Sequence, residues 1–272
     1  VSQSGNDAND GLSWATSKLT IQNGVTTADA SADPTVWVAV GLLPPPVLPL
    51  QPTPIAYVEN ITVPDNVAVY GGFRGDETPP LAPRTLSTIV QSAVFGTSIF
   101  TAGSGDIIDG FTIENGFADT GGGILCIGTT CTISNNIIQN NIGRLGAGVY
   151  TDTAALTVID CEFLGNEVSD ISGTLAAGAS IYTTGPSLIV SNSTFTDESA
   201  SVTVTDASSA QGGAIYSTGG TFVKLDRCVF DGCLADGTQP TVFAYGGAVY
   251  ITDALTAITN CVFHACAAQG SG

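Results

Sequence analysis

A motif that returns every 32 to 35 residues constrains the fold of this chain more than any other feature. Each copy opens with glycines and a short strand, and it closes with a strand that contains Phe; the clearest copies run over residues 146–163, 178–195, 212–233 and 246–266. The opening strands carry Tyr150, Tyr182, Tyr216 and Tyr250, spaced by 32, 34 and 34 residues. A period of this length is typical of a solenoid or a propeller.

Strand length separates these two architectures. Each repeat holds three short strands with alternating side chains, whereas a propeller blade needs four antiparallel strands joined by hairpins. Three strands this short bury nothing unless similar coils lie above and below them. We therefore expect an all-β, single-stranded right-handed parallel β-helix, a solenoid with three short strands per coil and an N-terminal cap. Its second corner should stack residues that tolerate left-handed backbone, namely Asn135, Asp160, Asn192, Arg227 and Asn260.

The repeats GGGIL…SNNII (121–138) and GASIY…SNSTF (178–195) resemble those of secreted bacterial right-handed parallel β-helix proteins with a pectate-lyase-like fold. The segments NDGLSWATSKLTIQNGV, VWVAVG, NVAVYGGFRGDET and IIDGFTIENG stand in the order usual for that family. The resemblance covers most of the chain. It implies the β-helix fold, but the family contains lyases, hydrolases and adhesins, so it does not imply one activity.

The order of segments predicts a cap at residues 1–33 and a β-helix at residues 34–272. In relatives the first region closes the β-helix, and we expect Trp14 to seal the first coil. Residues 41–56 form a proline-rich insertion that should be extended. It is either an apolar flap on the first coils or a docking surface; the assembly contacts that we predict on it are Leu42, Leu43, Val47, Leu48, Leu50 and Ile55.

Seven cysteines indicate an oxidising compartment. Three pairs share a five-residue step, and we predict three local disulfides: Cys126–Cys131, Cys228–Cys233 and Cys261–Cys266. The rival connectivity joins adjacent coils, Cys228 to Cys261 and Cys233 to Cys266, although parallel Cβ vectors disfavour it. Cys161 is then a buried free thiol.

Glycosylation sequons, net charge and the length of apolar runs indicate where the protein is located and which partners it has. Asn60 and Asn192 begin N-glycosylation sequons, and Asn192 also belongs to the predicted corner ladder. A formal net charge of −18 disfavours nucleic acid and anionic membranes, and no apolar run reaches the ~20 residues of a membrane span. We expect an extracellular or cell-surface protein. No motif indicates a metal site or a cofactor; calcium remains an alternative reading of the negative charge.

The outward side of the first strands is where related enzymes carry their catalytic groups. Asp152 and Asp253 follow these strands at unmatched levels, with Thr184 and Thr218 between them, and Arg144 is the nearest base. No pair of carboxylates emerges, so we assign no catalytic residue. The outward row of Tyr150, Tyr182, Tyr216 and Tyr250 has three open interpretations: a surface that stacks sugar rings, a contact surface for a partner, or a stripe that variable loops cover.

Two functions follow. The favoured one is an extracellular structural or adhesive protein that assembles with copies of itself, end to end, into a fibre. The alternative is a polysaccharide lyase or hydrolase, or a carbohydrate-binding module. The last repeat, residues 246–266, lacks a capping segment within the sequence, and an open β-helix end invites edge pairing. A longer chain, a cap from a neighbouring subunit or a tolerated open end would each account for it.

Overall fold

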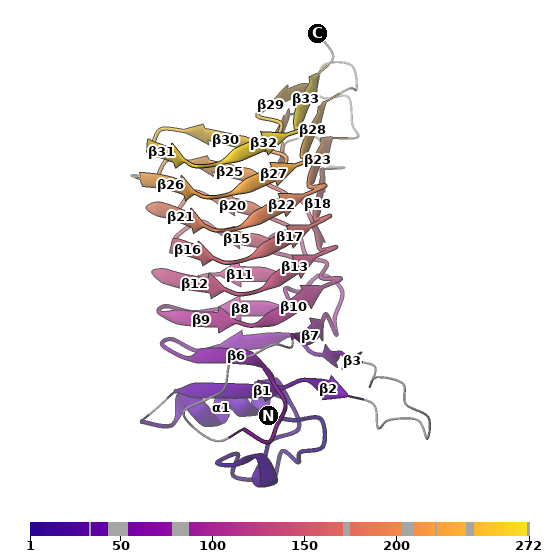
Figure 1. Cartoon of the computed structure of the whole chain (residues 1–272), viewed down its shortest axis with the longest axis vertical. Helices are drawn as coiled ribbons and strands as arrows, with labels where there is room; N and C mark the ends of the chain where they lie inside the picture. Colours follow the sequence, from indigo (N-terminus) through magenta and orange to yellow (C-terminus); the bar gives the residue numbers. More distant parts are fainter. Residues whose placement is uncertain are drawn as a thin grey trace.

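The computed structural model describes residues 1–32, 34–42, 54–77, 87–170, 175–202, 209–220, 222–237 and 242–270. The chain winds into a tall stack of coils that rises from the N-terminal end to the C-terminal end (Figure 1). Strands of successive coils pair in parallel and in register; for example, Phe163 pairs with Phe195 and Tyr150 with Tyr182. The expected all-β parallel β-helix is confirmed. No helix in the described part of the chain is long and apolar enough to cross a membrane.

Three sheets form the sides of the stack, and they correspond to the three predicted strands of each repeat. Sheet 1 contains β1 (Thr35–Ala39), β6 (Ala68–Phe73), β9 (Asp106–Asp109), β12 (Thr130–Ser134), β16 (Ala155–Ile159), β21 (Ser187–Ser191), β26 (Phe222–Asp226) and β31 (Leu255–Thr259). Sheet 2 contains β4 (Tyr57–Val58), β7 (Thr88–Gln91), β10 (Phe111–Glu114), β13 (Ile137–Gln139), β17 (Glu162–Leu164), β22 (Thr194–Thr196), β27 (Val229–Asp231) and β32 (Val262–His264). Sheet 3 contains β5 (Ile61–Val63), β8 (Phe100–Ala102), β11 (Ile124–Cys126), β15 (Val149–Thr151), β20 (Ile181–Thr183), β25 (Ile215–Thr218) and β30 (Val249–Thr252).

The upper coils contain two further strands that the repeat did not predict. They stand where we expected loops, and they form two small parallel sheets along one edge of the stack (Figure 1). Sheet 4 contains β14 (Ile142–Gly143), β18 (Glu167–Asp170), β23 (Ser199–Val202), β28 (Leu234–Gly237) and β33 (Ala267–Gly270), and sheet 5 contains β19 (Leu175–Ala177), β24 (Ser209–Gln211) and β29 (Phe243–Tyr245). Small side chains such as Val168, Ala200 and Ala210 form a separate core in this part.

The main core lies between sheets 1, 2 and 3 and consists of side-chain ladders. In sheet 2, the rings of Phe163, Phe195, Phe230 and Phe263 stack with centroids 4.7–4.8 Å apart and interplanar angles of 3–8°. The first three rings are fully buried. Such stacking follows from in-register parallel pairing, because coils repeat at the strand spacing of ~4.8 Å.

The corner between sheets 1 and 2 has the predicted backbone. Its residues have φ between +51° and +55°, and they are Asn135, Asp160, Asn192, Arg227 and Asn260. Glycine is required before sheet 3, where Gly146 has a φ of +55° and an added Cβ would lie 2.3 Å from the carbonyl oxygen of Val149. These corners keep every coil in the same register.

Buried asparagines join the lower coils at two inner positions. Asn136 accepts a hydrogen bond from the Phe111 N–H (2.9 Å) and donates one to the Ile108 carbonyl (2.8 Å). Asn166 likewise accepts from the Asn141 N–H (3.1 Å) and donates to the Ile138 carbonyl (2.8 Å). Each amide therefore satisfies backbone groups of the coil below it.

A helix closes the N-terminal end of the main core. Thr20 caps the N-terminus of helix α1 (Ile21–Asp29), and its side chain accepts from the Asn23 N–H. The helix buries Ile21 and Val25 completely in the main core. Trp14 belongs to the short 3₁₀ helix η1 (Trp14–Thr16) and contacts Phe73 at the side. The buried residues Ile21 and Val25 of α1 therefore cover this end of the main core, and the sealing role of Trp14 stays a prediction.

The described ends of the proline-rich insertion pair with each other. Strands β2 (Gly41–Leu42) and β3 (Pro54–Ile55) form an antiparallel ladder at one edge of the first coils (Figure 1). Ile55 is half-buried. Among the assembly contacts predicted for this insertion, Leu43, Val47, Leu48 and Leu50 lie outside the described residues, as does the Leu42 side chain.

Candidate functional site

The four predicted tyrosines form one continuous ladder on the outer face of sheet 3. Their ring centroids lie 5.1, 4.8 and 5.5 Å apart from Tyr150 to Tyr250, and the interplanar angles are 8–12°. The in-register pairing of β15, β20, β25 and β30 imposes this geometry. Neighbouring rings cover both faces of Tyr182 and Tyr216, so edges and hydroxyls, rather than ring faces, are what these two present to a ligand.

Sheet 5 flanks the tyrosine ladder and buries part of it. Leu145, Leu175 and Ala177 pack with the four rings in one cluster, and Tyr245 of β29 contacts Tyr250 with ring centroids 6.1 Å apart. Tyr216 is only 9% exposed, and burial raises its pKa to about 12. The strands of sheet 5, which follow the third strand of each repeat, therefore cover part of the tyrosine ladder.

Arg144, the base nearest the ladder, is already paired. Arg144 makes a two-point ion pair with Asp119, with Nε–Oδ1 and Nη2–Oδ2 distances of 3.0 and 3.1 Å. This hydrogen-bonded pair raises the pKa of Arg144. Asp152 and Asp253 are exposed, and the geometry does not bring them together across the coils between them. Among the described residues, no group of three or more His, Cys, Asp or Glu side chains is placed to hold a metal ion.

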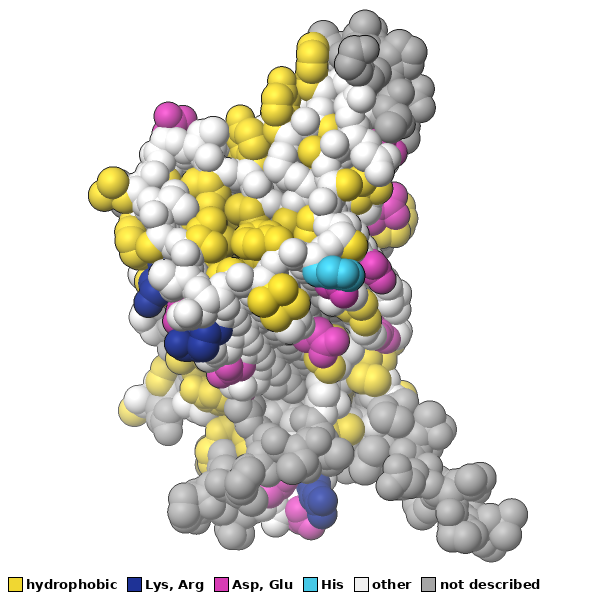
Figure 2. Space-filling model, turned by 45° about the horizontal axis from the view of Figure 1, so that its top comes forward, with side chains coloured by type: hydrophobic (Ala, Val, Ile, Leu, Met, Phe, Trp, Pro, Cys, Tyr) yellow, Lys and Arg dark blue, Asp and Glu magenta, His cyan; other side chains and the backbone are white. Residues whose placement is uncertain are grey.

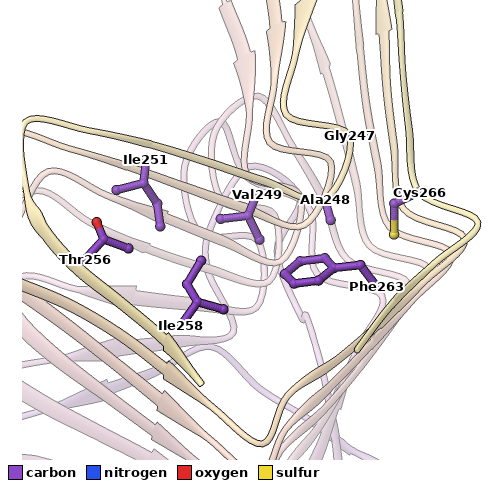
Figure 3. A pocket seen from close by; sticks show the side chains of 8 residues that line it. All are labelled: Gly247, Ala248, Val249, Ile251, Thr256, Ile258, Phe263 and Cys266. Atoms are coloured by element: carbon purple, nitrogen blue, oxygen red, sulfur yellow. The ribbon is translucent and has the colours of Figure 1, made fainter. Parts of the chain in front are cut away.

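The last described coil, residues 246–270, presents an apolar hollow at the upper end of the stack. Strands β30, β31, β32 and β33 are each the outermost strand of their sheets, and the inward side chains of Ile251, Ile258 and Phe263 point into the space that the last coil encloses (Figure 3). This hollow measures about 420 Å³. Figure 2 shows hydrophobic side chains gathered inside a largely polar rim. Ile258 and Phe263 are 44% and 48% exposed, although their counterparts Leu225 and Phe230 are fully buried.

All seven cysteines lie within the described residues and stand as free thiols, and the three local disulfides stay a prediction. Cys126 and Cys131 do lie in contact inside one coil, as the predicted local pair requires. Cys228 instead contacts Cys261 of the next coil, and Cys233 contacts Cys266. Inter-coil register brings equivalent residues together here, so these contacts match the rival connectivity and not the predicted local pairs Cys228–Cys233 and Cys261–Cys266. Cys161 is buried, and burial raises its pKa to about 12.

The two sequons differ in how they use their asparagines. The Asn60 side chain donates to Ser92 Oγ and to the carbonyls of Thr97 and Ser98, at 2.8–3.2 Å. A glycan on its nitrogen would disrupt this local network. Asn192 is exposed at its corner, where its Oδ1 accepts from Arg227 Nε at 2.6 Å. The side-chain nitrogen of Asn192 is therefore more accessible for glycosylation than that of Asn60.

One buried carboxyl escaped the reasoning from sequence. Glu198 follows β22, is 0% exposed and occupies the inner position that Asn166 holds in the coil below. Its Oε1 accepts from Asn166 Nδ2 at 3.2 Å, but its Oε2 and the buried Ser180 hydroxyl lack a hydrogen-bond partner among the described residues. Burial raises the pKa of Glu198 to about 8, against the opposing effect of its hydrogen bonds with Asn166. Only the alignment of Asn166, Glu198 and Cys233 within the repeats could have indicated this site.

Comparison with known proteins addresses the fold directly. No curated protein and no solved structure matches the chain. A family model described as a right handed beta helix region matches residues 87–272, which is more than half of the sequence. The match spans the coils that carry the phenylalanine stack, the tyrosine ladder and the open end. This chain therefore belongs to the right-handed β-helix family.

Proposed function

We propose that this protein is a structural or adhesive β-helix rod, located outside the cell or on its surface, that associates end to end with copies of itself. The observation that supports the proposal is the apolar hollow on the last described coil, residues 246–270, where residues equivalent to fully buried ones are about half exposed. Exposed apolar patches of this kind mark interaction surfaces. The strand edges around the hollow supply backbone groups for pairing.

The two ends of the rod differ, and the difference sets the geometry of association. The exposed side of α1 is polar and includes Asn23, Thr26 and Thr27. A polar helix is a poor partner for an apolar hollow, so contact between two open ends buries more apolar surface than contact of an open end with a capped one. A self-complementary contact of this kind closes on itself. We therefore propose a discrete two-chain rod in place of the fibre expected from the sequence.

Light scattering of the purified chain, combined with negative-stain imaging, tests this proposal. We expect a dimer and rods of doubled length. Ile258→Asp places a charge in the hollow and should give a monomer. The matched control is Val262→Asp on the same coil, because Val262 is 54% exposed but lies on the outer side of β32. A wild-type chain that stays monomeric at high concentration, or equal effects of the two variants, would contradict the proposal.

The enzymatic alternative has less support. The base nearest the tyrosine ladder, Arg144, is held in an ion pair with Asp119, and stacking covers the faces of the central rings. A sugar ring packs against the face of an aromatic side chain. We accordingly propose that the ladder serves as an external spine of the stack and that its outer edges contact the surroundings.

A further inference from the structure

Four cysteines fill two inner positions of the last two described coils. Cys228 and Cys233 flank β27, and Cys261 and Cys266 flank β32 in the same way. These two strands pair in parallel with Val229 opposite Val262 and Phe230 opposite Phe263. Register therefore places Cys261 above Cys228 and Cys266 above Cys233.

Contacts between coils favour vertical pairs, which join equivalent cysteines of successive coils, over local pairs within one coil. The Cys228 N–H points at Cys261 Sγ at a distance of 3.5 Å, and the thiol groups of these two residues interact directly. The thiol groups of Cys233 and Cys266 also interact directly. Paired parallel strands lie ~4.8 Å apart, which falls inside the Cα–Cα range of ~4.4–6.8 Å that disulfides use. Between the two vertical pairs stands the Phe230–Phe263 stack.

We propose that Cys228–Cys261 and Cys233–Cys266 are two redox-dependent staples, which form by exchange with a small-molecule disulfide and fasten one coil covalently to the next. Both outer thiols, Cys261 and Cys266, are half-buried, whereas Cys228 and Cys233 are fully buried. The outer member of each pair is therefore the one that an oxidant reaches first. This inference rests on the register of β27 and β32 and is independent of any association through the open end.

The exchange balances in two steps. The Cys261 thiol loses its proton and attacks one sulfur of the small disulfide, which gives a mixed disulfide and releases one small thiolate. The Cys228 thiol then loses its proton and attacks the Cys261 sulfur, so that the second small thiolate leaves. Two protein thiols are oxidised to one disulfide, the small disulfide is reduced to two thiols, and these take up both protons. Cys266 and Cys233 react in the same order.

The chain contains its own controls. Cys161 occupies the same inner position as Cys228, but Ser193 stands above it, and the Cys161 N–H donates to Ser193 Oγ at 3.2 Å. With no thiol above it, Cys161 should stay reduced in the folded protein. The contact pair Cys126–Cys131 is buried on both sides, so it should react with a bulky oxidant more slowly than the half-buried pairs.

Disulfide mapping of the folded full chain tests the staples. The protein is incubated with excess oxidised glutathione, free thiols are alkylated, and chymotrypsin is added under non-reducing conditions. Cleavage after Phe230, Tyr245 and Phe263 places the four cysteines on four different peptides. We expect the Cys228 peptide linked to the Cys261 peptide and the Cys233 peptide linked to the Cys266 peptide. Links between Cys228 and Cys233, or four alkylated thiols after full equilibration, would overturn the proposal.

A second readout uses stability and one conservative variant. Oxidation should raise the urea midpoint of the wild type and lower the number of titratable thiols by four before Cys126 and Cys131 react. In the Cys261→Ser variant, oxidation should remove only two titratable thiols and should raise the urea midpoint less than in the wild type. Serine already occupies the equivalent position as Ser193, so the fold should tolerate the substitution. Cys161→Ser is the matched control and should keep the full response. If Cys161→Ser weakened the response to oxidation as much as Cys261→Ser does, the assignment would be wrong.

Discussion

The same two inner positions are filled by amides in the lower coils and by thiols in the upper coils. Asn136, Asn141 and Asn166 bond backbone groups of the coil below, with distances of 2.8–3.1 Å. Cys228 and Cys233 make only long contacts of 3.5–3.7 Å through sulfur. Hydrogen bonds to sulfur are weak. The lower coils are thus joined by strong polar contacts at these positions, and we expect the upper coils to gain comparable strength there when their thiols are oxidised.

Glu198 lies at the boundary between these regions and should produce the largest effect. Because its pKa is about 8 in the folded protein, the native state keeps a proton that the unfolded chain loses above its ordinary pKa of 4.5. The free energy of unfolding should therefore fall as pH rises from 4.5 to 8. Glu198→Gln should remove this loss, which amounts to roughly 4 kcal/mol.

Urea denaturation of both proteins between pH 4 and pH 9 measures this difference. The control is Glu167→Gln, since Glu167 is exposed at the start of β18. Wild-type and Glu198→Gln stabilities that run parallel over the whole pH range would show that the carboxyl is not held protonated.

Asn166→Ala should have the next largest effect. The substitution leaves the Asn141 N–H and the Ile138 carbonyl without their buried partner, at a cost of about 3 kcal/mol. Chemical denaturation at pH 5, where Glu198 is neutral, would measure it. A loss below 1 kcal/mol would mean that the amide ladder does not hold the lower coils together.

Cys228→Ala under reducing conditions should cost less, about 1 kcal/mol, because the thiol contributes packing and only weak hydrogen bonds. The ratio of this loss to that of Asn166→Ala, measured in one buffer, sharpens the comparison between the two regions. A thiol variant that loses as much as the amide variant would remove the distinction.

Arg227→Asn should have the smallest effect, within about 0.5 kcal/mol of zero. Arg227 is exposed, and its contacts with Asn192 and Asp226 are surface interactions. Asparagine adopts a φ of +53° more readily than arginine does. Thermal unfolding checks this outcome; a large loss would show that the outer corner, rather than the inner positions, joins the coils.

The sequence predicted the parts of the fold that repeat with constant chemistry. The period of Tyr150 to Tyr250, the phenylalanine stack and the left-handed corner that includes Asn135 and Asn192 were all readable, because each coil reuses one residue type at one position. Sheets 4 and 5 were missed because their strands lie in segments of varying length and bury small residues such as Ala200. The inner positions were missed because Asn166, Glu198 and Cys233 share a location but no chemistry.

Disulfides between equivalent residues of successive coils are disfavoured by strand geometry, and the structure qualifies this reason. Parallel Cβ vectors within a strand disfavour a bridge, but Cys228 lies at a corner, directly after Arg227 with its φ of +53°. Only the register between β27 and β32 shows which sulfurs meet, and register depends on the whole stack.

Hydrogen exchange followed by mass spectrometry tests the central comparison most directly. In the reduced protein, peptides from residues 246–270 should exchange faster than those from residues 121–166. Adding oxidised glutathione should slow exchange in residues 246–270 and leave residues 121–166 unchanged, and Cys261→Ser should weaken this response. Equal protection of both regions in the reduced protein, or exchange in residues 246–270 that oxidation does not alter, would contradict the account.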